Sequence, residues 1–159
     1  MLGPEHPNTL LTMANLASTY SNQGRWNEVE QLGLQVMDIQ MKVLGPEHPN
    51  TLSTMGNLAN TYFHQRRWNE AEQLGLQVID IQKKLLGPEH PNTLLTMGNI
   101  ANTYFHQRRW NEADQLGLQV MDIQKKLFGP EHPDTLSSIQ KLTGIRQHGS
   151  KQKRWSLTS

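Results

Sequence analysis

The chain alternates short stretches in which apolar residues recur at steps of three and four, a spacing that places them along one face of a helix. The first stretch is followed by a polar turn at residues 22–24 and then by a second stretch of the same kind. The pattern therefore predicts two consecutive amphipathic helices. Their apolar faces consist of Leu10, Met13, Leu16, Ala17 and Tyr20 in the first helix, and of Val29, Leu32, Val36, Ile39 and Val43 in the second.

Residues at the helix ends support this pattern. Pro7 suits a first helical turn, where its missing N–H is not needed. Asn27, followed three residues later by Glu30, predicts a capping box at the start of the second helix. Gly45 and Pro46 predict where that helix stops.

A five-residue phrase, Gly-Pro-Glu-His-Pro, recurs at regular intervals along the chain. Its copies begin, 42 residues apart, at Gly3, Gly45, Gly87 and Gly129. The stretch 44–85 differs from 86–127 at only four positions. The two predicted helices are therefore one repeating unit, and a single such hairpin cannot bury its apolar face without neighbours.

Stacking of these hairpins predicts an all-α solenoid in which each unit contacts only the next. After Gly129 the sequence departs from the repeat. Lys141 and Arg146 occupy the positions that Asn57 and Tyr62 hold in the second repeat. Such polar substitutions suit a terminal helix whose outer face meets water. We expect repeats over residues 2–43, 44–85 and 86–127, a partial capping repeat over 128–148, and a basic, disordered tail over 149–159 that holds the eroded start of one more helix.

The pattern resembles the tetratricopeptide repeat, in the 42-residue version found in kinesin light chains and in the arrays attached to fungal and bacterial nucleotide-binding regulators. The resemblance rests on "LGPEHPNTL", on "NLASTY" with its copies "NLANTY" and "NIANTY", and on "QRRWNEAEQL". It implies a right-handed α-solenoid of stacked helix-turn-helix repeats. One departure is glycine in the middle of each second helix, at Gly33, Gly75 and Gly117, which costs about 1 kcal/mol relative to alanine at each place.

Composition and charge narrow the class of function. The chain has no cysteine, which excludes disulfides and thiolate metal sites and favours a reducing, cytoplasmic setting. No apolar run reaches the length of a membrane span. Residues 1–140 carry a net charge of −4 and residues 141–159 carry +5. A basic tail can touch nucleic acid or an anionic membrane, but five charges over this length favour a solvated terminus.

Histidine beside glutamate in each Gly-Pro-Glu-His-Pro phrase raises the question of a metal site. The four copies are held a hairpin apart, with packed helices 8–10 Å from each other in general, so they cannot share one ion whose ligands lie at about 2 Å. The phrase is interpreted as a helix stop, a turn and a helix start. The histidines concerned are His6, His48, His90 and His132.

The tryptophans and arginines of the repeat favour a structural role over a catalytic one. Trp26, Trp68 and Trp110 begin the second helices and are expected to pack between hairpins rather than to stack on bases. The arginine pairs at 66–67 and 108–109 fall in turns and are expected to be solvated, although an aligned row could receive acidic ligands. The sequence contains no nucleotide-binding loop and no plausible nucleophile, base and orienting group. We therefore expect no enzyme activity, no cofactor and no metal.

The resemblance places a binding surface on the first helices, where such repeats form a concave groove and where an asparagine contacts the main chain of an extended peptide. A carboxamide can donate and accept, so it suits a peptide backbone. Gly56 and Gly98 would let a ligand backbone approach closely. The open alternative is that these asparagines bond only to neighbouring helices. The predicted peptide-binding residues are Asn15, Asn57, Asn99, Asn60, Asn102, Phe63, Phe105, His64 and His106.

Two classes of function follow from these observations. The favoured hypothesis is a non-enzymatic protein-interaction scaffold that binds an extended peptide or partner segment. The alternative is a self-associating array whose repeat ends meet, or a piece of a longer nucleotide-dependent regulator or kinesin-light-chain-like adaptor. Partners are expected to be proteins, with no membrane and with nucleic acid disfavoured.

Overall fold

The computed structural model describes residue 3 and residues 5–156, with side chains described through residue 150. Over these residues the chain forms seven helices and no strand. The odd-numbered helices begin at the second proline of each Gly-Pro-Glu-His-Pro phrase, and those between them begin at a tryptophan. The helices are α1 (Pro7–Asn22), α2 (Trp26–Val43), α3 (Pro49–His64), α4 (Trp68–Leu85), α5 (Pro91–His106), α6 (Trp110–Phe128) and α7 (Pro133–Ser156).

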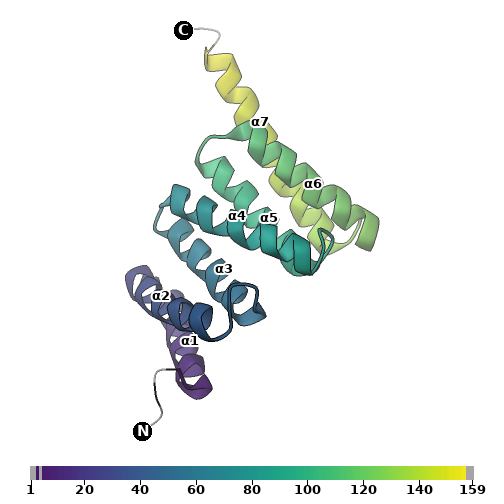
Figure 1. The fold of residues 1–159 in the computed structure, drawn as a ribbon. Coiled ribbons are helices and arrows are strands. Elements are labelled where there is room, and N and C mark those ends of the chain that lie inside the picture. The colour runs from purple at the N-terminus through teal and green to yellow at the C-terminus, as the bar shows by residue number, and fades with distance from the viewer. Residues whose placement is uncertain (1–2, 4, 157–159) are drawn as a thin grey trace. The chain divides into compact units, whose positions relative to one another are not determined.

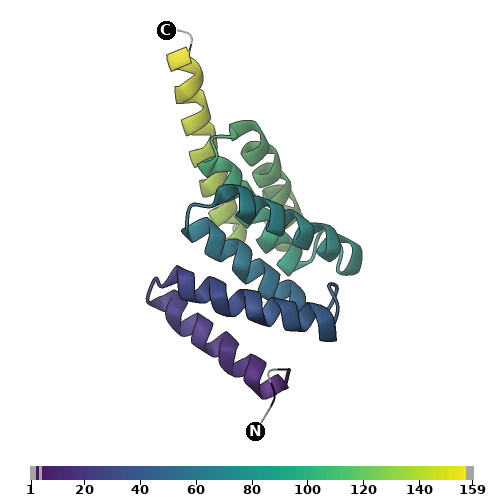
Figure 2. The same ribbon diagram turned by 60° about the vertical axis from the view of Figure 1, so that its left-hand side comes forward.

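The chain divides into two compact units, Met1–Ile81 and Gln82–Ser159, and the boundary falls inside α4. In the first unit α1 packs on α2, and α2 packs on α3. In the second unit α5 packs on α6, and α6 packs on α7. Each helix can be followed to the next along the colour gradient of Figures 1 and 2. Both units therefore show the successive helix-on-helix packing that the periodicity predicted.

The histidine of each Gly-Pro-Glu-His-Pro phrase caps the helix that follows it. Its ring Nδ1 accepts a hydrogen bond from the main-chain N–H two residues later, at 3.1 Å for His6 and His48 and 3.2 Å for His90. This acceptor satisfies an amide that the helix itself leaves unpaired, as a serine or aspartate cap does elsewhere. The glycine of the phrase takes a left-handed conformation, with φ between 86° and 93° at Gly45, Gly87 and Gly129. The structural interpretation of the phrase is confirmed.

The turn inside each hairpin also needs one left-handed residue. Gly24 fills this place in the first hairpin, with φ of 69°, but Arg66 and Arg108 fill it in the next two, with φ of 61° and 62°. The capping box expected at Asn27 and Glu30 is wrong, because α2 already begins at Trp26 and no side chain caps it. Both side chains instead reach residues of the next repeat.

The core of the first unit joins three helices. Leu52 and Met55 of α3 contact Val78 of α4, and partly buried Met37, Leu74 and Ile81 pack around them. Leu58, also in α3, is 1% exposed and lies against the backbone of α2 at Gly33. In the second unit Leu142 of α7 approaches Gly117 of α6 in the same way. Gly33 and Gly117 thus each leave room for a leucine from the following repeat.

The last helix differs from expectation. Helix α7 runs without a break to Ser156, so residues 149–156 continue the capping helix rather than forming a separate disordered tail. Ser150 occupies the register of Gly24, Arg66 and Arg108, yet stays helical, so the chain does not turn there. Residues 157–159 of the expected tail lie outside the described residues.

Candidate functional site

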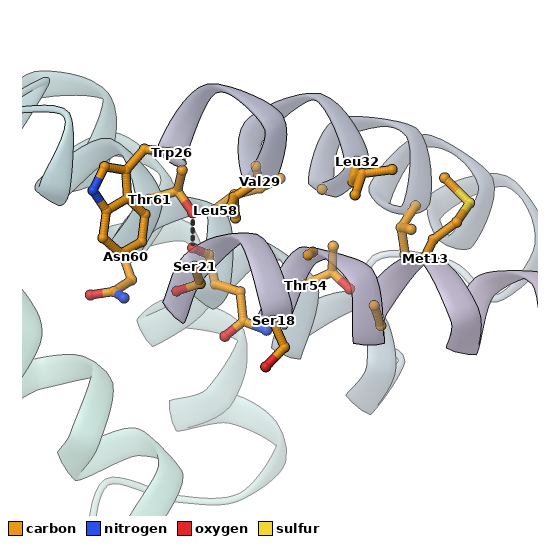
Figure 3. Close-up of a pocket in the computed structure, with 15 residues that line it drawn as sticks. Met13, Ser18, Ser21, Trp26, Val29, Leu32, Thr54, Leu58, Asn60 and Thr61 are labelled. Carbon is orange, nitrogen blue, oxygen red and sulfur yellow. Dashed lines mark hydrogen bonds between the residues drawn. The ribbon is translucent and has the colours of Figure 1, made fainter. Parts of the chain in front are cut away.

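A groove of about 200 Å³ lies between α1 and α3 in the first unit, with α2 as its floor (Figure 3). Small side chains from α1 form one wall, and hydroxyl and amide side chains from α3 form the other. All the residues that line it are uncharged. They are Met13, Ala14, Ala17, Ser18 and Ser21 of α1, Trp26, Val29, Leu32, Gly33 and Val36 of α2, and Thr54, Asn57, Leu58, Asn60 and Thr61 of α3.

The α3 wall presents two carboxamides, from Asn57 and Asn60, and both side chains are exposed. Thr61 donates its hydroxyl to the main-chain carbonyl of Asn57 at 2.8 Å, which is a bond within the helix. Within the part of the chain that the structure describes, neither carboxamide forms a hydrogen bond to a neighbouring helix. The carboxamides of Asn57 and Asn60 are therefore available to the groove and to solvent.

The second unit has a groove in the same register, between α5 and α7 over α6, with a volume of about 290 Å³. Asn99 and Asn102 line it from α5, and their carboxamides also form no hydrogen bond among the described residues. Gly98 on α5 and Gly144 on α7 add no side chain to this groove. A Cβ atom at either position would meet no other atom within 4 Å, so the backbone of each wall is open there. Its other lining residues are Ala101, Phe105, Gly117, Val120, Ser138, Lys141, Leu142 and Ile145.

Aromatic rings join successive hairpins at the edge of each unit. The His64 ring at the end of α3 stacks on the Trp26 ring at the start of α2, with 4.2 Å between centroids and 3° between planes. In the second unit His148 stacks on Trp110 at 6.2 Å and meets Phe105 edge-on at 5.2 Å. The tryptophan at the start of a second helix thus packs between hairpins, as the sequence predicted.

A polar cluster holds the turn of the second hairpin against α2. Arg67 contacts Glu30 at 2.7 Å and Glu70 at 2.9 Å, and its guanidinium lies 4.4 Å from the centre of the Tyr62 ring. Gln65 donates to the other oxygen of Glu30 at 2.8 Å and to Asn27 at 3.1 Å. Of the arginine pair expected to be solvated, Arg67 is therefore occupied by partners within the fold.

The cluster sets the charge state of Glu30. Partial burial raises the pKa of this carboxyl, but the hydrogen bonds from Gln65 and Arg67 and the charge of Arg67 outweigh burial, so the pKa lies below its ordinary value. The hydrogen bonds of Arg67 to Glu30 and Glu70, with the charges of these two carboxylates, raise the pKa of Arg67. Glu30 is thus held as a carboxylate that links two repeats.

Among the described residues there is neither a metal-binding cluster nor a membrane-spanning helix. No group of three or more histidine or acidic side chains among them could hold a metal ion. None of the described helices combines the length and the apolar character needed to cross a membrane.

Comparison with known proteins identifies the architecture. A sequence profile described as tetratricopeptide repeat matches residues 11–84, 56–126 and 95–152. The chain belongs to the tetratricopeptide repeat (TPR) family. Repeats of this family typically serve as protein–protein interaction scaffolds and are generally not enzymes.

Solved TPR structures share this fold. Two crystal structures of a kinesin-light-chain-like protein of Podosopora anserina with nearly identical TPR-like repeats, one of them a point variant, give TM-scores of 0.84 and 0.82. Each is 36% identical, over 99% of this chain and 75% of the matched chain. BtubC (BKLC) from P. vanneervenii gives a TM-score of 0.80 at 16% identity, over 87% of this chain and 56% of its own, which shows the fold alone. The predicted all-α solenoid class is confirmed. A comparison with curated protein sequences found no match.

The TPR grooves include some of the predicted binding residues and leave out others. Asn57 and Asn60 line the groove of the first unit, and Asn99, Asn102 and Phe105 line that of the second. The remaining predicted residues, Asn15, Phe63, His64 and His106, lie outside the lining of these two grooves.

Sequence reasoning missed several lining residues. Ser18 and Ser21 form the wall opposite the asparagines, and Lys141 faces the second groove. The 42-residue register contained a signal for Lys141, because it stands at the asparagine position of the fourth copy. His64 likewise has a packing contact, with Trp26, that the sequence did not predict.

Proposed function

We propose that this TPR array is a non-catalytic interaction module that binds an extended segment of a partner protein along its first helices. The observation that carries the proposal is the placement of Asn57 with Asn60, and of Asn99 with Asn102, on groove walls with their carboxamides unbonded within the described chain. We propose a cytoplasmic setting, in keeping with the absence of cysteine.

The chemistry of the walls suits a peptide main chain. An extended segment presents unpaired N–H and C=O groups, and a carboxamide can pair with both kinds without demanding one side chain. Small residues opposite, such as Ala14, Ala17 and Ser18, keep the groove wide enough for a backbone. Gly98 has the same effect in the second unit, because it adds no side chain to the groove.

The test removes one carboxamide from each groove. The probe is a display library of random dodecapeptides, panned against the intact protein, and the peptides it selects are then titrated against Asn57→Ala combined with Asn99→Ala. We expect binding to weaken about thirtyfold, because each of the two lost pairs of hydrogen bonds contributes about 1 kcal/mol. Asn50→Ala with Asn92→Ala is the matched control, since these exposed residues lie on the same helices outside both grooves. Equal binding by the groove variant and the control would overturn the assignment.

Self-association is the second candidate, and a separate observation favours it. Leu16 of α1 is 41% exposed, whereas Leu58, at the same place in the next repeat, is 1% exposed. An apolar position that is buried elsewhere in the array is thus open to a second copy. Sedimentation across a wide range of protein concentration tests this, with Leu16→Gln as the variant that should remove any dimer. A strict monomer at every concentration would eliminate the candidate.

A further inference from the structure

We infer that the open face of α7 is a docking site for one amphipathic helix of a partner protein, apolar in its C-terminal half and basic in its last turn. The open face is the side of α7 that carries Leu136 and Ile139. The groove of the second unit uses other residues of this helix, among them Ser138 and Lys141. Helix docking here is therefore independent of peptide binding in the grooves.

The apolar residues of the open face are buried in the repeats that have a second helix. Leu94 and Met97, at the same places in α5, are 3% and 0% exposed, whereas Leu136 is 52% and Ile139 is 37% exposed. The equivalent pair in α3 contacts Val78 of α4, the second helix of the same repeat. Helix α7 thus keeps the apolar positions on which a second helix packs, and no helix covers them among the described residues.

The charge beside the open face indicates how the docked helix ends. Glu131 belongs to the last Gly-Pro-Glu-His-Pro phrase, and its counterpart Glu89 pairs at 3.0 Å with Lys126 in the last turn of α6. Glu131 is exposed and pairs with no basic side chain among the described residues. Asp134, in the first turn of α7, adds a second carboxylate. A helix that docks as α6 docks on α5 would bring its last turn to these carboxylates, and lysine there also suits the helix dipole.

The opposite end of the open face is polar. In the third repeat the rings of Phe105 and Trp110 meet at 5.0 Å and join the end of α5 to the start of α6. Helix α7 has Gln147 in place of Phe105, and Thr143 in place of Ala101, and both are exposed. Because two helices joined by a short turn run antiparallel, the start of a helix docked in this way lies at the polar end. Its N-terminal half is therefore polar, and its C-terminal half supplies the apolar contacts.

A second copy of this chain is a poor source of the docked helix. Its second helices already pack within the array: α2 contacts α1 and α3, α6 contacts α5 and α7, and α4 contributes Val78 to the core of the first unit. Releasing one of them would expose as much apolar surface as docking covers. A helix of a partner protein meets no such cost.

The probe is a synthetic peptide with the sequence of α6, residues 110–128, because this helix shows both the apolar stripe and the basic last turn. A lactam bridge between positions 115 and 119, both exposed in the fold, keeps the isolated peptide helical. Fluorescence anisotropy measures its binding to the full-length protein and to variants whose folding is checked by circular dichroism.

Two variants separate the open face from other exposed apolar positions. Leu136→Gln combined with Ile139→Gln removes the apolar residues of the face. Leu95→Gln is the matched control, because Leu95 is also exposed, as is Leu11 at the same place in the first repeat. We expect the double variant to bind at least tenfold more weakly than wild type, since two apolar side chains lose their contact with the peptide. The control should bind like wild type.

Two changes test the polarity of the docked helix. Glu131→Lys in the protein should weaken binding about threefold, and Lys126→Glu in the peptide should restore it, as for an exposed ion pair. Trp110→Ser in the peptide should leave binding unchanged, because Gln147 offers no ring for that tryptophan.

Three outcomes would overturn the inference. One is the absence of binding at millimolar peptide. Another is binding that Leu16→Gln removes and the double variant keeps, which would place the peptide on α1. The third is a wild-type dimer that the double variant disperses, because the face would then belong to a second copy. The dodecapeptide titration of the asparagine variants judges the proposed function separately.

Discussion

Gly33 in α2 leaves the space that Leu58 of α3 fills: a Cβ atom at Gly33 would lie 2.8 Å from Cδ2 and 3.0 Å from Cγ of Leu58. Leu58 is 1% exposed, so it has little room to withdraw. We predict that Gly33→Ala destabilises the protein by about 1 kcal/mol, because the overpacking outweighs the gain in helix propensity. Urea unfolding followed by circular dichroism measures the change.

Gly56 provides the matched control for this prediction. It is also helical, but a Cβ atom there would meet nothing within 4 Å. Gly56→Ala should therefore stabilise the protein by about 1 kcal/mol, since only the propensity term operates. If both alanine variants shift the urea midpoint in the same direction, the glycine at position 33 does not serve packing.

The cap formed by His48 gives a second prediction. Its Nδ1 accepts from the N–H of Asn50 at 3.1 Å. His48→Ala should cost about 1 kcal/mol of unfolding free energy because that amide loses its acceptor, while His48→Asp should retain most of it. Thermal unfolding of the two variants at neutral pH separates the outcomes. Equal loss in both would mean that the ring matters for packing instead of capping.

Local patterns predicted the helices because their causes are local. The proline after each histidine, the left-handed glycine and the three-and-four spacing of apolar residues all act within a few residues of the boundary they set. The capping box at Asn27 and Glu30 was wrong because residues of the next repeat, Gln65 and Arg67, bind these side chains. A contact across 35 residues or more is not visible in a short window of sequence.

The asparagines of the candidate site were predictable from the repeat spacing, but the residues opposite them were not. The repeat register placed Asn57 and Asn99 at equivalent positions, and the structure puts each on a groove wall. The wall opposite Asn57 comes from another helix, so the role of Ser18 required the folded chain. Lys141 was interpreted as a capping substitution, because the sequence does not show that its helix borders a groove.

Arg66 leads to a third prediction, which concerns backbone strain. Its φ of 61° is a conformation that costs most residues about 1 kcal/mol and glycine much less. Arg66→Gly should therefore stabilise the protein by about 0.5–1 kcal/mol, and Gly24→Arg should have the opposite effect. Arg66→Ala separates backbone from charge, because alanine keeps the strain and removes the guanidinium. A gain with alanine equal to that with glycine would assign the effect to the side chain.

Glu30 gives the last prediction, a dependence of stability on pH. The pKa of its carboxyl is lower in the folded protein than in the unfolded chain, so its contribution is complete above the unfolded value of about 4.3 and is lost as pH falls through the folded value. At pH 7, Glu30→Gln should lower the free energy of unfolding by about 1 kcal/mol. The loss is modest because the Arg67 side chain is 39% exposed, so that solvent screens its ion pair with Glu30. The difference between wild type and variant should shrink as the pH falls below the unfolded pKa of about 4.3. Glu47→Gln, at an exposed position without an ion pair among the described residues, should show no such convergence. A Glu30→Gln difference that stayed constant from pH 7 to pH 3 would show that the carboxylate does not link the two repeats.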